Sequence, residues 1–207
     1  MSKNKRELTE EELLRKERFE KLQVEMKQNG YREKSLTAGV WKGNIVAFIV
    51  MLPFVIGNGW LYVTVNSLTE LSLPNGVLFF IMFLWLVVVH ELIHAAVWGL
   101  FASDHFRSIE FGIILKALTP YCTCSQPLKK WQYMLGGVMP TLVLGFGIAA
   151  AAIIFRSDFW FYMSEFMLFS GGADFYIALK MLLYRTKSRD IVYYDHPYEL
   201  GVVLFEK

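Results

Sequence analysis

The 207-residue chain is 55% apolar and 16% aromatic, and only 19% of its residues are charged. Soluble domains carry roughly 25% charged residues, so this composition argues against a soluble globular protein and favours a membrane protein. The net charge of +2 conceals an uneven distribution, because residues 1–43 hold eleven of the 21 Lys and Arg together with eight Glu. These charges largely compensate one another, which argues against a nucleic-acid partner.

The first region, residues 1–38, is expected to be cytoplasmic and to contain an amphipathic helix over residues 9–29. Thr9 and Glu12 form a capping box at its start, and Gly30 is expected to end it. The apolar side chains on one face are Phe19, Leu22 and Met26. Such a helix binds a partner, lies on the membrane surface or merely solvates the N-terminal region.

Four apolar segments follow within residues 39–185. They cover residues 40–65, 76–102, 131–155 and 159–184. Each exceeds the roughly 20 residues that a helix needs to cross the hydrocarbon core of a bilayer. We therefore expect an all-α integral membrane protein with about four transmembrane helices forming one membrane core.

The basic residues predict the orientation of these segments. The loop 67–75 has no Lys or Arg, whereas the loop 103–130 and the tail 186–207 contain several. The positive-inside rule then places both termini and the loop 103–130 in the cytoplasm. Small cytoplasmic β elements are expected at residues 108–115 and 191–205, where β-branched and aromatic residues gather.

The sequence His90-Glu91-Leu92-Ile93-His94 lies inside the second apolar segment. Residues four apart lie on one face of a helix, so the two imidazoles can hold one zinc ion. The carboxylate between them can act as general base toward a zinc-bound water, whose pKa the metal lowers to about 7. Buried His and Glu are costly in a membrane, which favours this function over hydrogen bonds between helices or metal binding without catalysis.

Zinc held by two His needs a third protein ligand, and Asp174 is the preferred candidate. It follows Gly171 and Gly172, whose lack of side chains allows the chain to unwind or to approach a metal closely. His94 and Asp174 are expected roughly 12 and 16 Å from the cytoplasmic ends of their helices, which are comparable depths. The alternative is a buried Asp that only hydrogen-bonds to a neighbouring helix.

Other side chains are weaker candidates for the third ligand. Glu165 lies nearer the outer end of the fourth segment. His105 and Glu110 follow the motif so closely that only a re-entrant loop brings either of them back to it. Leu100 stands where the metzincin pattern has its third His, so that pattern does not apply.

Three further features have both structural and functional interpretations. Asp195 and His196 are expected to form a turn before a strand, with capping of the site or alternate metal ligation as the other interpretations. Cys122 and Cys124 are poorly spaced for an ordinary disulfide and are expected to be reduced thiols. Pro140 frees a backbone carbonyl in the third segment, either in a packing kink or beside a polar cavity.

These motifs together resemble the "putative zincin peptidase" family of small bacterial membrane proteins, over about residues 75–205. The resemblance rests on His90-Glu-Leu-Ile-His94, Leu118-Thr-Pro-Tyr121, Pro140 after a Gly pair, Gly172-Ala-Asp174 and Asp195-His-Pro197. The arrangement is also similar to site-2 intramembrane metalloproteases, which carry a metal-binding Asp in a later membrane helix. The resemblance implies a multi-pass protein of the bacterial cell membrane that cleaves peptide bonds in or near the bilayer.

The sequence thus predicts a zinc metalloendopeptidase with one Zn²⁺ per chain. His90, His94 and Asp174 are the predicted ligands, and Glu91 is the predicted catalytic base. The expected partners are the lipid bilayer and a membrane-associated protein or peptide substrate. Two other functions stay open: a non-proteolytic metal-binding regulator or chaperone, which the intact Glu91 disfavours, and a cation transporter, which the absence of a repeat disfavours.

Overall fold

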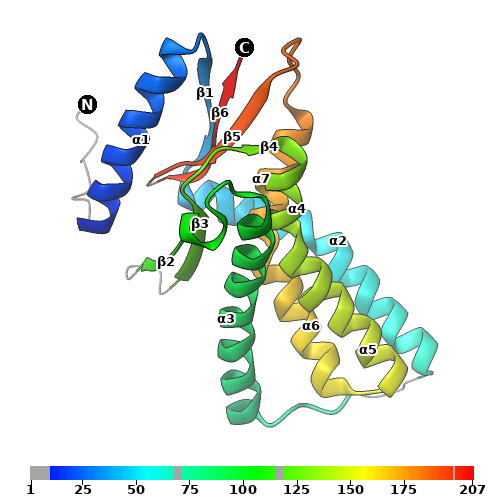
Figure 1. Cartoon of the computed structure of the whole chain (residues 1–207). Coiled ribbons are helices and arrows are strands. Elements are labelled where there is room, and N and C mark those ends of the chain that lie inside the picture. Colours follow the sequence, from blue (N-terminus) through cyan, green and yellow to red (C-terminus); the bar gives the residue numbers. More distant parts are fainter. Residues whose placement is uncertain (1–9, 68–70, 115–118, 198) are drawn as a thin grey trace, which may run out of the picture.

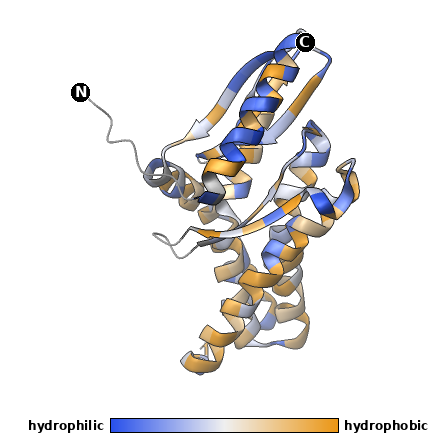
Figure 2. Cartoon of the chain, turned by 60° about the vertical axis from the view of Figure 1, so that its left-hand side comes forward, coloured by the Kyte–Doolittle hydropathy of each residue, from blue (hydrophilic) through white to orange (hydrophobic). Residues whose placement is uncertain are grey.

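The structure is a computed structural model and describes residues 10–67, 71–114, 119–197 and 199–207. Long helices form a bundle, and a smaller cap of strands and one helix lies at one end of it (Figure 1). The bundle is mostly hydrophobic, whereas the cap helix is strongly hydrophilic on its outer side (Figure 2). Helices make up 67% of the residues that the structure describes, and some strands are present.

The bundle is built from the four predicted apolar segments, which are helical over nearly the expected residues. Its elements are α2 (Val40–Asn66), α3 (Gly76–Phe101), α4 (Lys130–Pro140), the π-helical turn η2 (Thr141–Gly147), α5 (Ile148–Phe155), α6 (Asp158–Ser170) and α7 (Gly172–Leu183). Among the described residues, α2, α3 and the continuous run α4–η2–α5 are each long and apolar enough to cross a membrane. The pair α6–α7 makes a fourth span if the two helices are counted as one.

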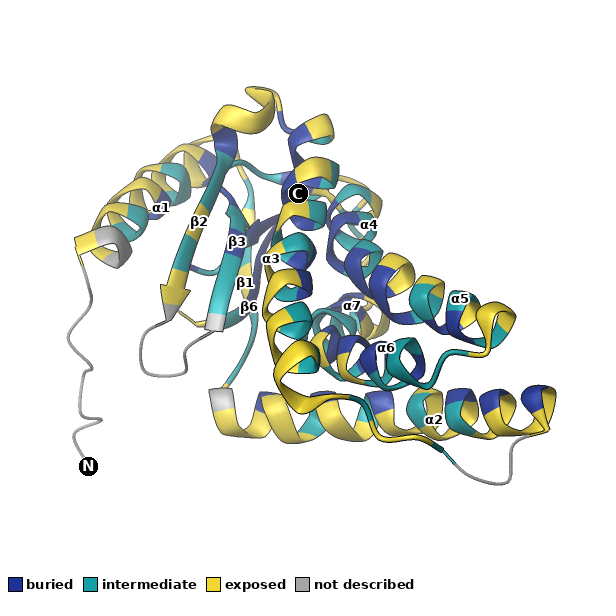
Figure 3. Cartoon of the chain, turned by 90° about the horizontal axis from the view of Figure 1, so that it is seen from below, coloured by how far each residue is buried: buried dark blue, intermediate teal, exposed yellow. Residues whose placement is uncertain are grey.

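Many residues along α2 and α3 are exposed (Figure 3), and a large share of them are large apolar residues. Examples are Phe48, Trp60, Phe80 and Trp85. Such a surface is expected to contact lipid, since a soluble protein rarely exposes so large an apolar area. The described chain thus has three candidate spans, or the predicted four if α6–α7 counts as one, while insertion into a bilayer and the orientation across it stay predictions.

The fourth segment is broken at Gly171, where α6 and α7 meet at an angle of 45°. The break brings the backbone so close to η2 that a Cβ at Gly171 would lie 1.6 Å from Thr141 Oγ1. Asp174 consequently falls in the first turn of α7. The predicted interruption at the Gly pair is present, and it begins a new helix directly before the carboxylate.

The cap contains a four-stranded antiparallel sheet in the order β1-β6-β5-β4. Its strands are β1 (Arg32–Ala38), β4 (Leu128–Lys129), β5 (Ile191–Asp195) and β6 (Leu200–Glu206). The helix α1 (Glu10–Gln28) covers the face of the sheet that is turned away from the bundle. Gly30, at φ +84°, follows this helix as predicted, whereas Thr9 and the side chain of Glu12, and with them the predicted capping box, lie outside the described residues.

The strand β6 is buried on both of its faces. Val202 and Leu204 pack toward the bundle in a core that includes Trp98. Val203 and Phe205 pack on the opposite face of the sheet, against α1. This two-sided burial explains why the tail sequence is continuously apolar instead of alternating.

A separate hairpin lies beside the C-terminal half of α3. It consists of β2 (Ile109–Ile114) and β3 (Thr119–Cys124), preceded by a short 3₁₀ turn, η1 (His105–Ser108). The β elements expected near residues 108–115 and 191–205 are therefore present. The all-α expectation is nevertheless too narrow, because β1 joins the tail strands into a sheet that the sequence did not predict.

Candidate metal centre

Three side chains that are predicted to bind zinc come together where α3 meets α7. The candidate ligand atoms of His90, His94 and Asp174 all lie within 4.8 Å of one another. Nε2 of His90 is 3.4 Å and Nε2 of His94 is 3.6 Å from the same carboxylate oxygen, Oδ2 of Asp174. Both His are buried, with 4% and 3% of their surface exposed.

The donor set fits zinc. Two imidazole nitrogens and one carboxylate oxygen form a ligand type that catalytic zinc sites use, with the fourth position left for water or substrate. The other ring nitrogen of His90, Nδ1, is buried and has no hydrogen-bond partner among the described residues. Two imidazoles that converge on one carboxylate oxygen are the arrangement expected around a shared cation.

His94 is oriented by a backbone carbonyl of the third segment. Nδ1 of His94 lies 2.8 Å from the carbonyl oxygen of Gly136. In an α-helix this oxygen would accept from the N–H four residues later, but that residue is Pro140, which has none. Donation from Nδ1–H to the carbonyl leaves the Nε2 lone pair directed at Asp174, as a ligand requires. The carbonyl that Pro140 frees is thus used to select the tautomer of His94.

Gly136 and Trp98 hold this arrangement together, and we predict that Gly136→Ala weakens zinc binding by roughly 10–100-fold. A Cβ at Gly136 would lie 2.0 Å from Nε1 of Trp98, which must then move. The indole of Trp98 stacks on the His94 ring with centroids 4.9 Å apart, so its displacement disturbs the ligand. Competition with a fluorescent zinc chelator measures the affinity.

The matched control is Gly137→Ala, because a Cβ at Gly137 meets nothing within 4 Å. This neighbour should keep the affinity of the unmodified protein. Equal zinc affinities for both variants would contradict the orienting role of the Gly136 carbonyl and of Trp98.

A cavity of about 360 Å³ opens onto the three candidate ligands. Glu91 lines it together with His90 and His94, so the predicted base faces the same space as the predicted ligands. The Glu91 carboxylate accepts a hydrogen bond from the backbone N–H of Cys122 in β3. Glu91 is therefore held between the bundle and the hairpin.

Residues of the cap also line the cavity, among them Asp195 and His196. One carboxylate oxygen of Asp195 accepts a hydrogen bond from the Tyr133 hydroxyl, and the other accepts one from the Cys124 N–H at 2.9 Å. Asp195 thus joins β5, α4 and β3 on the wall of the cavity, which is more than the turn expected from the sequence. It is not a member of the ligand cluster among the described residues.

Burial raises the pKa of Asp195 to about 6, although both hydrogen bonds act to lower it. In the unfolded chain its pKa is near 4, so the native state takes up this proton at the higher pH. Asp195 therefore lowers the free energy of unfolding at neutral pH, and this destabilisation diminishes as the pH falls through 6 toward 4.

Asp195→Asn should remove this pH dependence, since the amide does not ionise. We predict that the stability of the variant relative to the unmodified protein falls by on the order of 2–3 kcal/mol between about pH 7 and about pH 4. Denaturation of the metal-free proteins in detergent at several pH values measures the difference. A difference that stays constant with pH would show that Asp195 does not titrate in this range.

The two cysteines are free and buried. Burial raises the pKa of both thiols, that of Cys124 to about 12, so both stay protonated near neutral pH. The expectation of reduced thiols in a structural position agrees with these properties.

The weaker candidates for the third ligand lie elsewhere. Glu165 on α6 accepts a hydrogen bond from Nδ2 of Asn58 at 2.8 Å. Glu110 on β2 forms an ion pair with Arg18 of α1, and His105 belongs to the turn η1. Within the described part of the chain, Asp174 is the only carboxylate grouped with the two His. The roles of Trp98, Tyr133 and the Gly136 carbonyl at this site were not predicted from the sequence, because they arise from tertiary packing. Pro140 signalled a free carbonyl in the third segment, but not its partner His94.

The fold and this site define a class: a helical bundle with three or four candidate membrane spans and a candidate metal centre within it. Residues 83–189 match the family described as "Putative zincin peptidase". The match covers just over half of the chain and includes all four predicted site residues, so the chain belongs to this family. Membership suggests a metallopeptidase and implies zinc. Searches of curated proteins and of solved structures found no match.

Proposed function

We propose that this protein is a zinc metalloendopeptidase that cleaves membrane-associated peptide segments in the cytoplasmic half of the bilayer. The observation that carries this proposal is the convergence of His90, His94 and Asp174 on one wall of a cavity that Glu91 also lines. His90, His94 and Asp174 would hold one zinc ion. Bound zinc supplies a Lewis acid that polarises a peptide carbonyl and lowers the pKa of a water.

The chain's own residues have distinct tasks in this reaction. Glu91 accepts the proton of the attacking water and delivers it to the leaving amine, which is the usual work of a carboxylate general base. Gly136 keeps Nε2 of His94 available, as its carbonyl accepts from Nδ1. The apolar bundle around the site restricts water, which strengthens electrostatic interactions inside the cavity.

The hairpin is suited to present an extended substrate. The N–H groups of Cys122 and Cys124 point toward Glu91 and Asp195, so this edge of β3 faces the cavity and not β2. An extended peptide that enters the cavity beside β3 exposes its carbonyls, whereas a helical peptide shields them. We therefore propose that a substrate segment unwinds before it is cleaved.

The test uses purified protein in neutral detergent with a membrane-extracted peptide mixture. Cleavage products detected by mass spectrometry should disappear after treatment with 1,10-phenanthroline and return when zinc is added back. Magnesium added back in place of zinc serves as the control. Cleavage that persists after removal of all metal would overturn the proposal.

A further inference from the structure

The cap end of the metal cavity carries one basic side chain. Arg15 of α1 lines the same cavity as the candidate ligands and lies over the Tyr121 ring, and Glu199 lines the cavity as well. Among the described residues that line the cavity, Arg15 is the only Lys or Arg. The N-terminal helix therefore reaches the site, although it lies far from the motif in the sequence.

The guanidinium of Arg15 contacts an aromatic ring, and no carboxylate among the described side chains is paired with it. Its central carbon lies 4.7 Å from the centroid of the Tyr121 ring, which is the geometry of a cation–π contact. Its Nε is buried and has no hydrogen-bond partner in the described part of the chain. No described carboxylate, Glu199 included, forms an ion pair with it.

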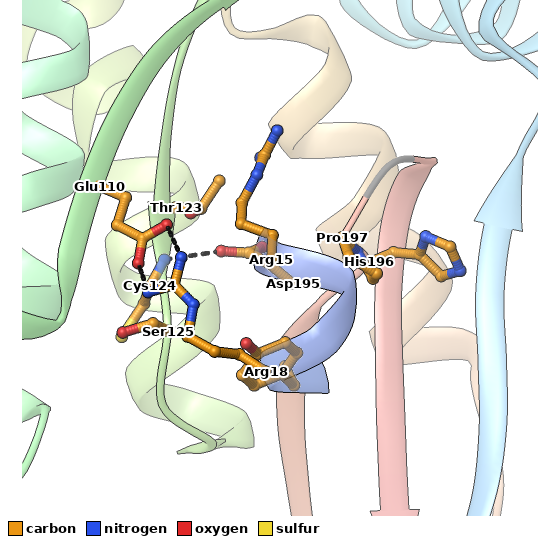
Figure 4. A pocket seen from close by; sticks show the side chains of 10 residues that line it. Arg15, Arg18, Glu110, Thr123, Cys124, Ser125, Asp195, His196 and Pro197 are labelled. Carbon is orange, nitrogen blue, oxygen red and sulfur yellow. Dashed lines mark hydrogen bonds and ion pairs between the residues drawn. The ribbon is translucent and has the colours of Figure 1, made fainter. Parts of the chain in front are cut away.

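The nearby Arg18, in contrast, is paired with a carboxylate. Both of its terminal nitrogens donate to the Glu110 carboxylate, whereas the side chain of Arg15 extends away from this pair (Figure 4). The Arg18–Glu110 pair joins α1 to the hairpin, and Phe19 anchors the same turn on the sheet through stacking on Tyr194. The position of Arg15 is therefore set by contacts on both sides of it.

We propose that Arg15 is a specificity-determining residue that binds a carboxylate of the peptide substrate at the cap end of the cavity. A guanidinium stays charged at all relevant pH values and offers paired N–H donors that match a carboxylate. The carboxylate belongs to an Asp or Glu side chain or to a free C-terminus. Asp195 forms no ion pair with Arg15 within the described chain, and its two oxygens accept from the Tyr133 hydroxyl and the Cys124 N–H instead. The proposal rests on the proposed function, since it concerns the same cavity.

The experiment measures peptide binding without cleavage. Zinc-loaded Glu91→Gln protein in phosphatidylcholine nanodiscs is immobilised and exposed to a mixture of random short peptides, with free C-termini in one arm and amidated C-termini in the other. Retained peptides are sequenced by mass spectrometry. The same selection is made with Arg15→Gln, Arg15→Lys and Arg15→Glu in the Glu91→Gln background, and with Lys16→Gln as the charge-matched control on the same helix.

Retained peptides should be enriched in Asp and Glu, or should need a free C-terminus. Retention that is lost in the amidated arm identifies the C-terminal carboxylate as the group that Arg15 binds. Enrichment in Asp and Glu that persists in the amidated arm identifies their side chains. Arg15→Gln should lower the enrichment about tenfold, the loss expected for one charge-assisted hydrogen bond. Arg15→Lys should keep part of it, Arg15→Glu should favour Lys and Arg, and Lys16→Gln should change nothing.

Identical peptide profiles with and without Arg15, or no enrichment in carboxylates at all, would overturn the inference. This outcome is separate from failure of the proposed function. Selection of acidic peptides by a protein that cleaves nothing would leave Arg15 as a recognition residue and remove the peptidase assignment. Cleavage without any preference for carboxylates would keep the peptidase assignment and remove the role of Arg15 in recognition.

Discussion

Glu91→Gln is expected to keep about one zinc per chain and to lower peptide cleavage by roughly 10²–10⁴-fold, the usual contribution of a general base. The amide has nearly the shape of the carboxylate but does not accept a proton from water. Its oxygen can still accept the hydrogen bond that the Cys122 N–H donates to the carboxylate. Zinc content by elemental analysis and cleavage rate are measured on the same preparation, so that loss of metal and loss of the base are separated.

The matched control is Glu199→Gln, since Glu199 lines the same cavity on an exposed part of its rim. This variant removes the same charge from the same space and should keep its cleavage rate within a small factor. Undiminished cleavage by Glu91→Gln would show that another group takes the proton. Loss of zinc from Glu91→Gln would instead place Glu91 among the metal ligands.

Asp174→Ala is expected to lose zinc. Removal of a group that only supports a metal ligand costs roughly 10–100-fold in affinity, and removal of a ligand is expected to cost more. The two His alone leave zinc with too few protein ligands for a stable catalytic site. Equilibrium dialysis against a zinc buffer measures the affinity, and activity should fall in parallel with zinc occupancy.

Glu165→Ala is the control, because Glu165 is also a carboxylate of the fourth segment but is bonded to Asn58, away from the His pair. It should keep its zinc. A protein with Asp174→Ala that binds zinc as tightly as the unmodified chain would require a different third ligand.

The helices of the bundle were predictable because long apolar runs have few other folded states. Asp174 was predictable for a related reason: a carboxylate within such a run is costly and needs a partner. The break at Gly171 was suggested by the Gly pair, and in the structure it coincides with a close approach to Thr141 that leaves no room for a side chain at Gly171. The local sequence was sufficient to predict a feature wherever the free-energy cost of exposing apolar groups or burying a charge determined the structure.

The cap was less predictable. The strand β1 has the sequence Arg-Glu-Lys-Ser-Leu-Thr-Ala, whose polar composition does not suggest a strand. It forms because β6 offers an edge for pairing from Arg32↔Glu206 to Ala38↔Leu200. The role of Arg15 was hidden for the same reason, since α1 reaches the cavity only when the sheet has formed beneath it. These features depend on contacts between distant parts of the chain.

The place of β6 in the sheet has a consequence for the order of events during synthesis. This strand lies between β1 and β5, so neither of those pairings forms before residues 200–206 have been made. Without the sheet, α1 has no apolar surface to cover and Arg15 is not brought to the cavity. The helices that carry the candidate metal ligands precede β6 in the chain. A nascent chain can thus assemble its candidate metal centre first, and it acquires the wall that we propose selects substrates only after β6 has been made.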